Sequence, residues 1–364
     1  MHEAGIWVDP PPRTDRPVFE RPTWIVSQEQ VDALVVAAGF AKSAADICGA
    51  GRPCLYAFYD GPADEAPIGA TRFGGEPDLS VATPWPQAET GRHLAFFAQI
   101  NLRDLATTAI AVDLPATGLL SFFAGDFDTG LDPVKVAVFL TPEGTPLERR
   151  ISPPRESFDD PETASFRPVS VRFEPGLCFP SFDWRWSELL AQANPGGDID
   201  MLMDGLNSGP SRALGRVCGY ASWPSDDLRE ELHFQELGRA GQERLRHWRS
   251  WGDWEQAKKI EHRSRRWSGR LDMLWYDLKY GSWFRRPSVY QPWSADDDDN
   301  VRWILENEVA INAGVARWTS LLEIDSNEAM GLWINDANPV YFFVRKDDLD
   351  RRDFSRAMAT TTQN

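Results

Sequence analysis

Residues 317–349 read RWTSLLEIDSNEAMGLWINDANPVYFFVRKDDL, and they repeat the plan of FFAQINLRDL at 96–105 followed by LPATGLLSFFAGDF at 114–127. In each copy an apolar strand ends in isoleucine and a polar residue, Ile100–Asn101 in the first and Ile324–Asp325 in the second. A turn region follows, and then a second strand that carries a phenylalanine pair. Two similar halves predict a duplicated β-rich unit in which neither half buries its sheet alone.

A corner rich in conformationally special residues precedes each copy. The first corner, at 73–86, reads FGGEPDLSVATPWP, and the second, at 218–224, reads CGYASWP. Gly74–Gly75 would allow a turn that is closed to residues with a Cβ atom, and Trp85 would plug the end of the sheet. A phosphate loop is the weaker interpretation, because G-x-G-x-x-G and G-x-x-x-x-G-K-[ST] are both absent there. We therefore interpret both corners as architectural.

Further strands and helices are predicted around the two copies. Ser27 is expected to begin a helix, because Gln30 stands three residues later, at the spacing of a capping box. Short apolar runs bounded by turn residues predict strands. The expected strands lie at 54–60, 119–124, 134–140 and 169–177, and residues 93–105 are expected to be a strand that runs into a short turn of helix. A second helix is expected at 186–193.

A long insertion separates the second corner from the second strand pair. Residues 225–315 have helical composition, with an i, i+3, i+4, i+7 stripe between Leu271 and Leu278. A last helix is expected to start at Asp296–Asp299, because acidic residues stabilise helix N-termini. The predicted fold class is thus α+β, a duplicated β-rich unit with a long helical insertion in its second half. The expected divisions are 1–64 for an N-terminal arm, helix and first strand, 65–215 for the first half, 216–350 for the second half and 351–364 for a flexible tail.

Together these motifs resemble the YwqG-like family of bacterial proteins. The likeness rests on F-G-G-x-P-x-L, W-P, L-A-F-F-A-Q-I-N-L and L-P-x-x-G-L-L-S-F-F in the first half, and on L-L-E-I-D-S-N and G-L-W-I-N-D-A-N-P-V-Y-F-F-V-R-K-D-D-L in the second. It covers residues 65–125 and 165–350. The resemblance implies a cytoplasmic protein with a duplicated α+β fold and no established catalytic chemistry. Some relatives are encoded near secreted polymorphic toxins, which implies an immunity role.

The sequence departs from the family pattern at two places. One is the insertion, which is rich in tryptophan and arginine. The other is WIND at 333–336, where relatives usually carry a Trp-Gly-Asp-like turn. Asn335 can adopt the left-handed conformation that glycine prefers, so we expect the turn to be kept.

Composition limits the classes of partner. The chain has 364 residues, a formal net charge of −17 and a pI near 4.8. This charge argues against a protein that coats duplex nucleic acid, and it favours solubility or a basic partner. We expect no membrane span, because no run of eighteen apolar residues occurs, and no secretory signal. The four cysteines lack metal-binding spacing, so we expect buried thiols in the cytoplasm, with a Cys48–Cys54 bridge as the alternative.

No motif for catalysis or metal binding is present. H-E-x-x-H and G-x-S-x-G are both missing from the sequence. Asp325, Glu328 and Asp336 could converge after the second strand pair, with Asn101 at the matching place in the first half, and paired carboxylates can act as general acid and base. The competing interpretation is that they cap turns and strand ends. We therefore predict no catalytic residue, no metal and no cofactor.

The insertion concentrates positive charge and tryptophan. Residues 239–270 hold ten Arg and Lys against four Asp and Glu. These helices could pack against the acidic body of the protein, or they could contact a protein partner, because Trp and Arg are enriched in binding hot spots. Nucleic acid, which such residues bind by stacking and phosphate contacts, is the least favoured interpretation. The residues expected to contact a partner are Trp248, Arg249, Trp251, Trp254, Arg266 and Trp267.

Two functional hypotheses follow. The leading one is a non-enzymatic cytoplasmic protein-binding protein, which as a toxin immunity protein would mask a basic toxin domain. The alternative is a small-ligand-binding protein or an enzyme, with a cleft between the two halves. The residues expected to line that cleft are Trp85, Asn101, Asp325 and Asp336. No nucleic-acid or membrane partner is expected, and the sequence does not indicate the oligomeric state.

Overall fold

The computed structural model describes residues 24–361 apart from several internal segments. These segments are 107, 109–111, 126, 128–133, 181–189, 191–192, 208, 211, 222–227, 239, 242–243, 246–294 and 335–336. The predicted apolar stripe between Leu271 and Leu278 therefore lies outside the described residues, as does most of the helix predicted at 186–193. Within the described part of the chain, no helix combines the length and apolar character needed to cross a bilayer.

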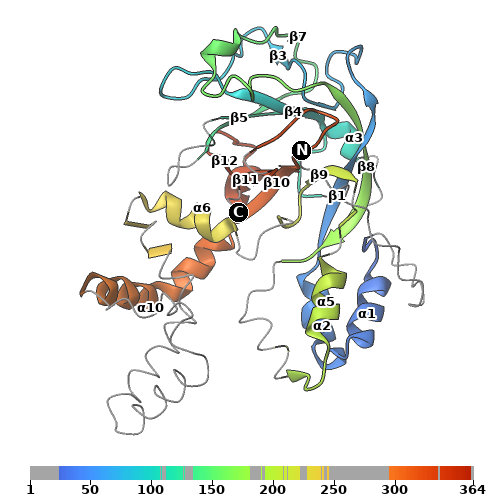
Figure 1. The fold of residues 1–364 in the computed structure, drawn as a ribbon, viewed down its shortest axis with the longest axis vertical. Helices are drawn as coiled ribbons and strands as arrows, with labels where there is room; N and C mark the ends of the chain where they lie inside the picture. Colours follow the sequence, from blue (N-terminus) through green and yellow to red (C-terminus); the bar gives the residue numbers. More distant parts are fainter. Residues whose placement is uncertain are drawn as a thin grey trace, which may run out of the picture.

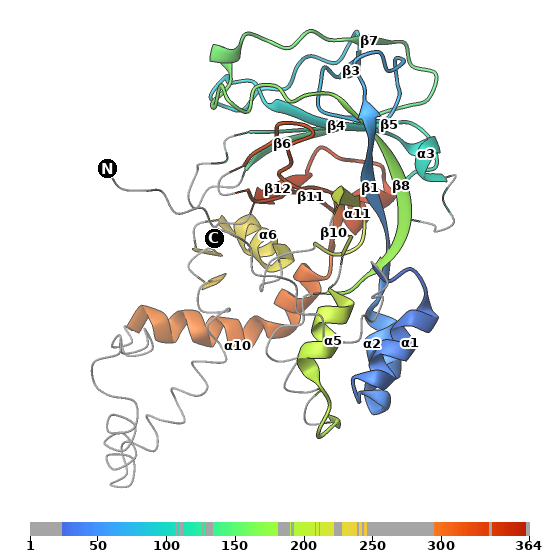
Figure 2. The same cartoon turned by 45° about the vertical axis from the view of Figure 1, so that its right-hand side comes forward.

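Ten strands form one antiparallel sheet that curls into a nearly closed barrel (Figures 1 and 2). Its order is β12-β11-β10-β9-β1-β8-β2-β4-β5-β6. The two edge strands meet, because Val134, directly before β6, pairs with Ala359 of β12. The strands are β1 (Arg52–Pro62), β2 (Arg72–Phe73), β4 (Ala95–Asn101), β5 (Leu119–Gly125), β6 (Lys135–Thr141), β8 (Val169–Cys178), β9 (Ala213–Val217), β10 (Trp318–Ile324), β11 (Val340–Arg345) and β12 (Met358–Thr361).

A two-stranded sheet of β3 (Asp78–Ser80) and β7 (Leu147–Arg149) lies over one end of the barrel (Figure 1). Short helices follow two of the barrel strands, α3 (Leu102–Ala106) after β4 and α11 (Lys346–Asp350) after β11. The strands predicted from the apolar runs are confirmed by β1, β4, β5, β6 and β8. The expected flexible tail at 351–364 is wrong for Met358–Thr361, which pairs with β11 as the edge strand β12.

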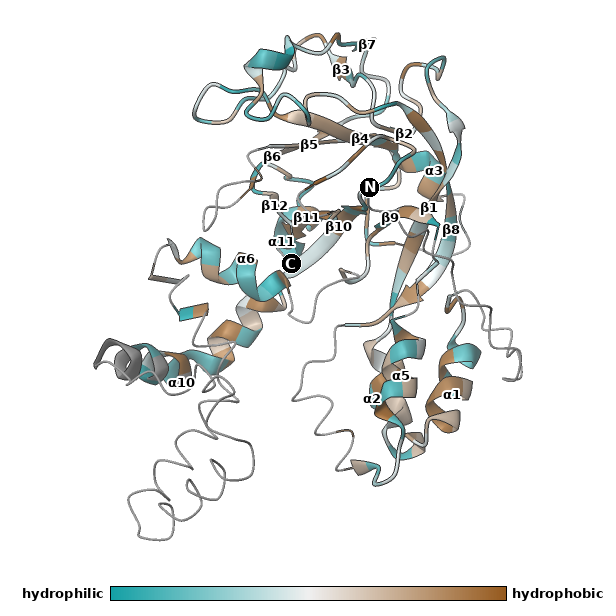
Figure 3. Cartoon of the chain, in the orientation of Figure 1, coloured by the Kyte–Doolittle hydropathy of each residue, from teal (hydrophilic) through white to brown (hydrophobic). Residues whose placement is uncertain are grey.

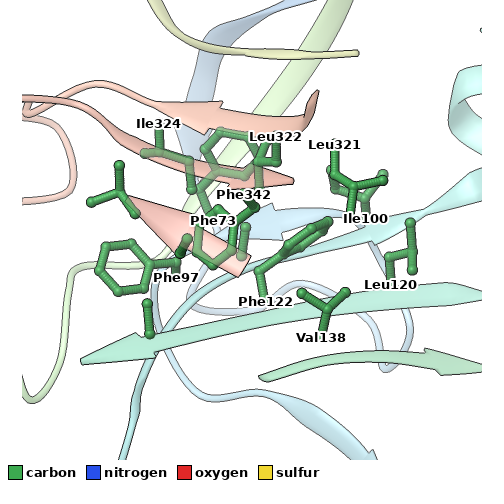
Figure 4. Close-up of a cluster of buried hydrophobic side chains, with 14 of the residues drawn as sticks. Phe73, Phe97, Ile100, Leu120, Phe122, Val138, Leu321, Leu322, Ile324 and Phe342 are labelled. Atoms are coloured by element: carbon green, nitrogen blue, oxygen red, sulfur yellow. The ribbon is translucent and has the colours of Figure 1, made fainter. Parts of the chain in front are cut away.

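The barrel interior is packed with apolar side chains from both predicted copies (Figure 4). The ring of Phe342 on β11 lies 5.2 Å from that of Phe122 on β5 and 5.9 Å from that of Phe97 on β4. Since side chains alternate along a strand, the neighbouring Phe123 points outward, 5.7 Å from the ring of Trp85. The two predicted phenylalanine pairs thus each supply one residue to the inner core.

Three helices form a separate layer beside the lower ends of β1 and β8 (Figures 1 and 2). They are α1 (Gln28–Ala37), α2 (Ala44–Ala50) and α5 (Ile199–Leu206), and they enclose their own apolar cluster. The predicted capping box is present, because the Ser27 hydroxyl accepts from the Gln30 amide and the Gln30 side chain accepts from the Ser27 amide. The cap fixes where the first helix begins.

Both described ends of the insertion are helical. The mostly hydrophilic helix α6 (Leu228–Glu236) packs Leu228 and Leu232 onto the outer face of β10 and β11 (Figure 3). The helix α10 (Ala295–Val315) begins one residue before the predicted acidic start and packs against Phe234 of α6. The prediction of a helical insertion is confirmed at these two ends, and the segment between them lies outside the described residues.

Candidate functional site

Two buried arginines occupy matching positions in the sheet. Arg72 on β2 pairs with Gln99 on β4, and Arg216 on β9 pairs with Glu323 on β10. Each arginine donates from Nη2 to the carbonyl oxygen four residues further on, that of Glu76 for Arg72 and that of Tyr220 for Arg216. Each arginine therefore ties a strand to the turn that follows it.

The backbone around the two arginines also matches. Two consecutive residues with positive φ follow each strand, Gly74–Gly75 after β2 and Cys218–Gly219 after β9. The amide of Gly74 donates to the carbonyl of Phe97 at 2.7 Å, and that of Cys218 donates to the carbonyl of Leu321 at 3.2 Å. Phe97 and Leu321 each lie at an irregularity of the sheet, where the register shifts between β4 and β5 and between β10 and β11 respectively. The two corners singled out in the sequence are thus the same turn.

The Arg72 network is closed by a buried carboxylate. Arg72 is 1% exposed and Asp78 is fully buried, with Nη1 of the arginine 3.0 Å from Oδ2 of the aspartate. Asp78 also accepts from the Gln99 side chain at 2.7 Å, from the Gly69 amide at 2.9 Å and from Arg149 at 3.1 Å. Burial raises the pKa of Asp78, but these hydrogen bonds outweigh it, so the pKa lies below its ordinary value. This network is saturated and holds β3 onto the barrel.

The Arg216 network lies on the outer face of the barrel and is less complete. The Glu323 carboxylate accepts from Arg216 Nη2 at 3.0 Å, with both side chains buried. Arg216 Cζ lies 5.8 Å from the centre of the Tyr56 ring. Among the described residues, the buried Nε of Arg216 has no hydrogen-bond partner. One donor of this buried guanidinium is therefore left over.

A second carboxylate, Asp325, stands beside this ion pair. It follows Glu323 by two residues, so the two acidic side chains leave β10 on the same face, and its amide donates to Leu214 at 2.9 Å. Within the described part of the chain, its carboxylate makes no hydrogen bond or ion pair. Burial and then repulsion from Glu323 raise the pKa of Asp325 to about 7, against the attraction of Arg216. A carboxyl group with this pKa can exchange a proton near neutral pH.

All four cysteines are free thiols, and the alternative Cys48–Cys54 bridge is wrong. Cys54 and Cys178 belong to one buried cluster with Tyr56, the residue whose ring Arg216 approaches. The Tyr220 amide donates to the Cys178 sulfur at 3.1 Å. Burial raises the pKa of Cys178, but the Cys54 thiol, Arg216 and this amide together lower it below its ordinary value. Three cysteines are buried as expected, whereas Cys48 is only partly buried and contacts Asp32.

Three of the four residues predicted to line a cleft, Trp85, Asn101 and Asp325, have different surroundings in the structure. Trp85 is partly buried over Phe123, and its indole nitrogen donates to the carbonyl of Leu94 at 2.8 Å. Asn101 donates to the carbonyl of Gly69 at 3.0 Å and caps the turn that follows β4. Of the three that the structure describes, Asp325 alone adjoins the Arg216 network, and Asp336 lies outside the described residues. The six predicted partner-contacting residues also lie outside them, namely Trp248, Arg249, Trp251, Trp254, Arg266 and Trp267.

Sequence reasoning missed both arginines and their partners. A signal was present, because RFGG at 72–75 and RVCG at 216–219 each place an arginine two residues before the turn. Asp78 and Arg149 have no such signal, since they meet only through the pairing of β3 with β7. In the part of the chain that the structure describes, no group of three or more His, Cys, Asp or Glu is placed to hold a metal ion.

A family comparison gives the context for this geometry. The comparison with curated proteins gives no match. A family described as "Domain of unknown function (DUF1963)" matches residues 71–362, from the residue before Arg72 to just beyond β12. This match covers both arginines, their carboxylate partners Asp78 and Glu323, and most of the chain, and the protein therefore belongs to the DUF1963 family.

Proposed function

We propose that the chain is a non-enzymatic protein-binding protein, in which the barrel is the scaffold and the helical insertion is the recognition element. The observation that supports this proposal most is the separate core of the insertion. Phe234 of α6 packs with Ile304, Ile311 and Val315 of α10, in a cluster distinct from the barrel interior. An element with its own core can present a varied surface without disturbing the sheet that bears it.

The anchoring of the insertion supports the same division of roles. The opposite side of α6 is fixed to the barrel by Trp318, Tyr341 and Phe343, so the insertion starts from a rigid base. The side of α10 away from this core exposes Glu306, Glu308 and Val309, the last being 85% exposed. Recognition elements on rigid supports lose less conformational entropy on binding.

Charge points to the kind of partner. The net charge of −17 favours electrostatic attraction of a basic protein. Tryptophan and arginine within residues 246–294 would then supply the specific contacts, as such residues do in binding hot spots. The likeness to the YwqG-like family extends this proposal to a cytoplasmic immunity protein that masks a toxin domain.

We also propose that the two halves are an internal duplication. The support is the matched pairing of Arg72 with Gln99 and of Arg216 with Glu323, each followed by the same left-handed turn. The inward phenylalanines Phe122 and Phe342 extend the correspondence to the next strand.

One observation favours the alternative of a small-ligand site. Asp325 and the unpartnered Nε of Arg216 are polar groups near each other that the described fold does not use. A ligand with one cationic or hydrogen-bonding group could pair with the Asp325 carboxylate there. Binding to Asp325 would be lost in Asp325→Asn, whereas binding through the insertion would not.

Partner capture tests the leading proposal. The full-length chain, a Trp251→Ala/Trp254→Ala variant and the matched control Trp333→Ala are compared as baits, because Trp333 is 54% exposed and lies outside the insertion. Each captured protein is then purified and titrated. We expect a basic partner that binds the wild type and the control but at least about tenfold more weakly to the double variant. Failure to find any partner with this dependence would contradict the proposal.

The immunity role has its own test. Expression of the captured partner alone should stop growth of the host cell, and co-expression of the chain should restore it. A partner that binds but is harmless would leave protein binding in place and remove the immunity role.

A further inference from the structure

We infer that Arg52 and Arg229, which lie over the Tyr220 ring at one end of the barrel, form with Lys346 a binding site for a phosphate group. This inference does not rest on the proposed protein partner. It arises from a local excess of positive charge in a strongly acidic chain.

Two of the cations share one aromatic ring. The guanidinium carbon of Arg52 lies 4.5 Å from the centre of the Tyr220 ring, and that of Arg229 lies 5.2 Å from it. Arg52 begins β1, Tyr220 follows β9, and Arg229 is the second residue of α6. The start of β1 thus meets the segment between β9 and α6, and two positive charges lie against one ring, where cation–π contacts fix their orientation.

Lys346 completes the cluster from a fourth element. It is the first residue of α11, directly after β11, and its amide donates to the carbonyl of Arg317 at 2.8 Å. Its side chain is exposed, but burial of part of it and then repulsion from Arg52 and Arg229 lower its pKa. Repulsion between like charges destabilises the folded protein, and an anion bound between them would relieve it.

Two of the three cations, Arg52 and Lys346, are not held in ion pairs in the part of the chain that the structure describes. Asp113 attracts Lys346 only from beyond ion-pair distance. The neighbouring Arg317 and Arg345 are already paired, with Asp347 and Glu236 respectively. Glu230 follows Arg229 in α6 and reduces the net charge of this region.

The chemistry of these groups favours phosphate over a simple halide. Guanidinium groups match tetrahedral oxyanions through paired N–H donors, and an ammonium group adds a compact charge. The N-terminus of α6, a helix of nine residues, adds a further positive partial charge at the same place. Because both guanidinium groups already lie over the Tyr220 ring, we expect the phosphate group itself, and not an attached base, to supply most of the affinity.

Calorimetric titration of the full-length chain tests the site. Inorganic phosphate and adenosine 5′-monophosphate are titrated at constant ionic strength in chloride buffer, so that screening stays the same. The variants are Arg52→Gln and Lys346→Gln, and the controls are Lys346→Arg and Lys42→Gln, since Lys42 is an exposed lysine outside the cluster. We expect saturable binding by the wild type and a loss of about tenfold in affinity in Lys346→Gln, the size of one charge-assisted hydrogen bond. Both controls should bind within about threefold of the wild type.

Each outcome has a defined meaning. Equal affinities for the two ligands support a site for free phosphate, and tighter binding of the nucleotide supports an organic phosphate. No saturable binding, or an equal loss in Lys42→Gln and Lys346→Gln, overturns the site. Circular dichroism and the unfolding midpoint of each variant show that any loss comes from the charge and not from unfolding.

Discussion

The Arg72 and Arg216 networks use the same backbone arrangement for different ends. In the first, Arg72 pairs with the amide Gln99 on the next strand, and the Asp78 carboxylate accepts hydrogen bonds from both of them and from Arg149. In the second, Arg216 faces the acid Glu323, and Asp325 stands where Asn101 stands in the first. The amides Gln99 and Asn101 of the first network thus correspond to the acids Glu323 and Asp325 of the second. Two changes from amide to acid therefore distinguish a fully hydrogen-bonded network from one that holds a titratable carboxyl group, Asp325, while the strand pairing stays the same.

The largest effect is expected from opening the saturated network. Asp78→Asn removes the carboxylate that pairs with the buried Arg72, and Arg72 cannot reach solvent to compensate. We expect the free energy of unfolding to fall by about 3–5 kcal/mol, as for other buried pairs broken at one partner. Urea denaturation measures it. The surface pair of Arg103 and Glu143 is the control, because Arg103→Gln should cost less than about 1 kcal/mol.

The shared turn is expected to give the next largest effect. Gly74 has φ +70, and a Cβ atom there would lie 2.4 Å from the carbonyl oxygen of Arg167. Gly74→Ala should therefore lower the free energy of unfolding by about 2–4 kcal/mol, from left-handed strain and the displaced backbone. Gly144→Ala is the matched control, because Gly144 has φ +81 and open space around it. Equal losses in the two variants would show that close packing at the turn contributes nothing.

The second network should be more tolerant of losing its ion pair. Glu323→Gln places a glutamine where Gln99 stands in the first network, and Arg216 keeps its contact with Tyr220. Asp325 can then ionise and neutralise Arg216, so we expect a loss of about 1–2 kcal/mol, smaller than that in Asp78→Asn. The double variant Glu323→Gln/Asp325→Asn removes this compensation. Its loss should exceed the sum of the two single losses, and simple additivity would argue against the coupling.

The last expected effect is a change in the pH dependence of stability and not a loss of stability at one pH. The pKa of Asp325 is raised in the folded state, so between pH about 4 and about 7 the folded protein holds a proton that the unfolded chain releases. The free energy of unfolding should therefore fall as pH rises through this window, by up to about 1.4 kcal/mol per pH unit for this group, and stay level above it. Asp325→Asn should lose this slope. Identical pH profiles for the two proteins would show that Asp325 does not titrate there.

Local patterns predicted much of the fold. The Ser27 capping box, the β4, β5 and β10 strands and the acidic start of α10 depend on residues close together in sequence. Barrel closure through Val134 and Ala359 did not follow, because it joins segments more than two hundred residues apart. The edge strand β12 was missed because a polar run precedes its four residues.

The candidate site was predictable only in part. Asp325 was recognised from its place at the end of an apolar strand, and the structure puts it beside a buried ion pair. Trp85 and Asn101 were also singled out in the sequence, but Trp85 packs against Phe123 and Asn101 caps the turn after β4. The charged neighbours of Asp325 are Arg216 on β9 and Glu323 on β10. The pairing of these two strands cannot be predicted from the sequence of either strand alone.

The central comparison is tested most directly by a nuclear magnetic resonance titration of the ¹³C-labelled aspartate carboxyl groups. Asp78 and Asp325 are followed in the same spectra, with Asp325→Asn and Asp78→Asn used to assign their signals. We expect Asp325 to titrate with a pKa of about 7, and Asp78 to stay ionised below its ordinary pKa because four donors hold its carboxylate. In Glu323→Gln the pKa of Asp325 should move down. An Asp325 that titrates like Asp78, near or below pH 4, would contradict the account.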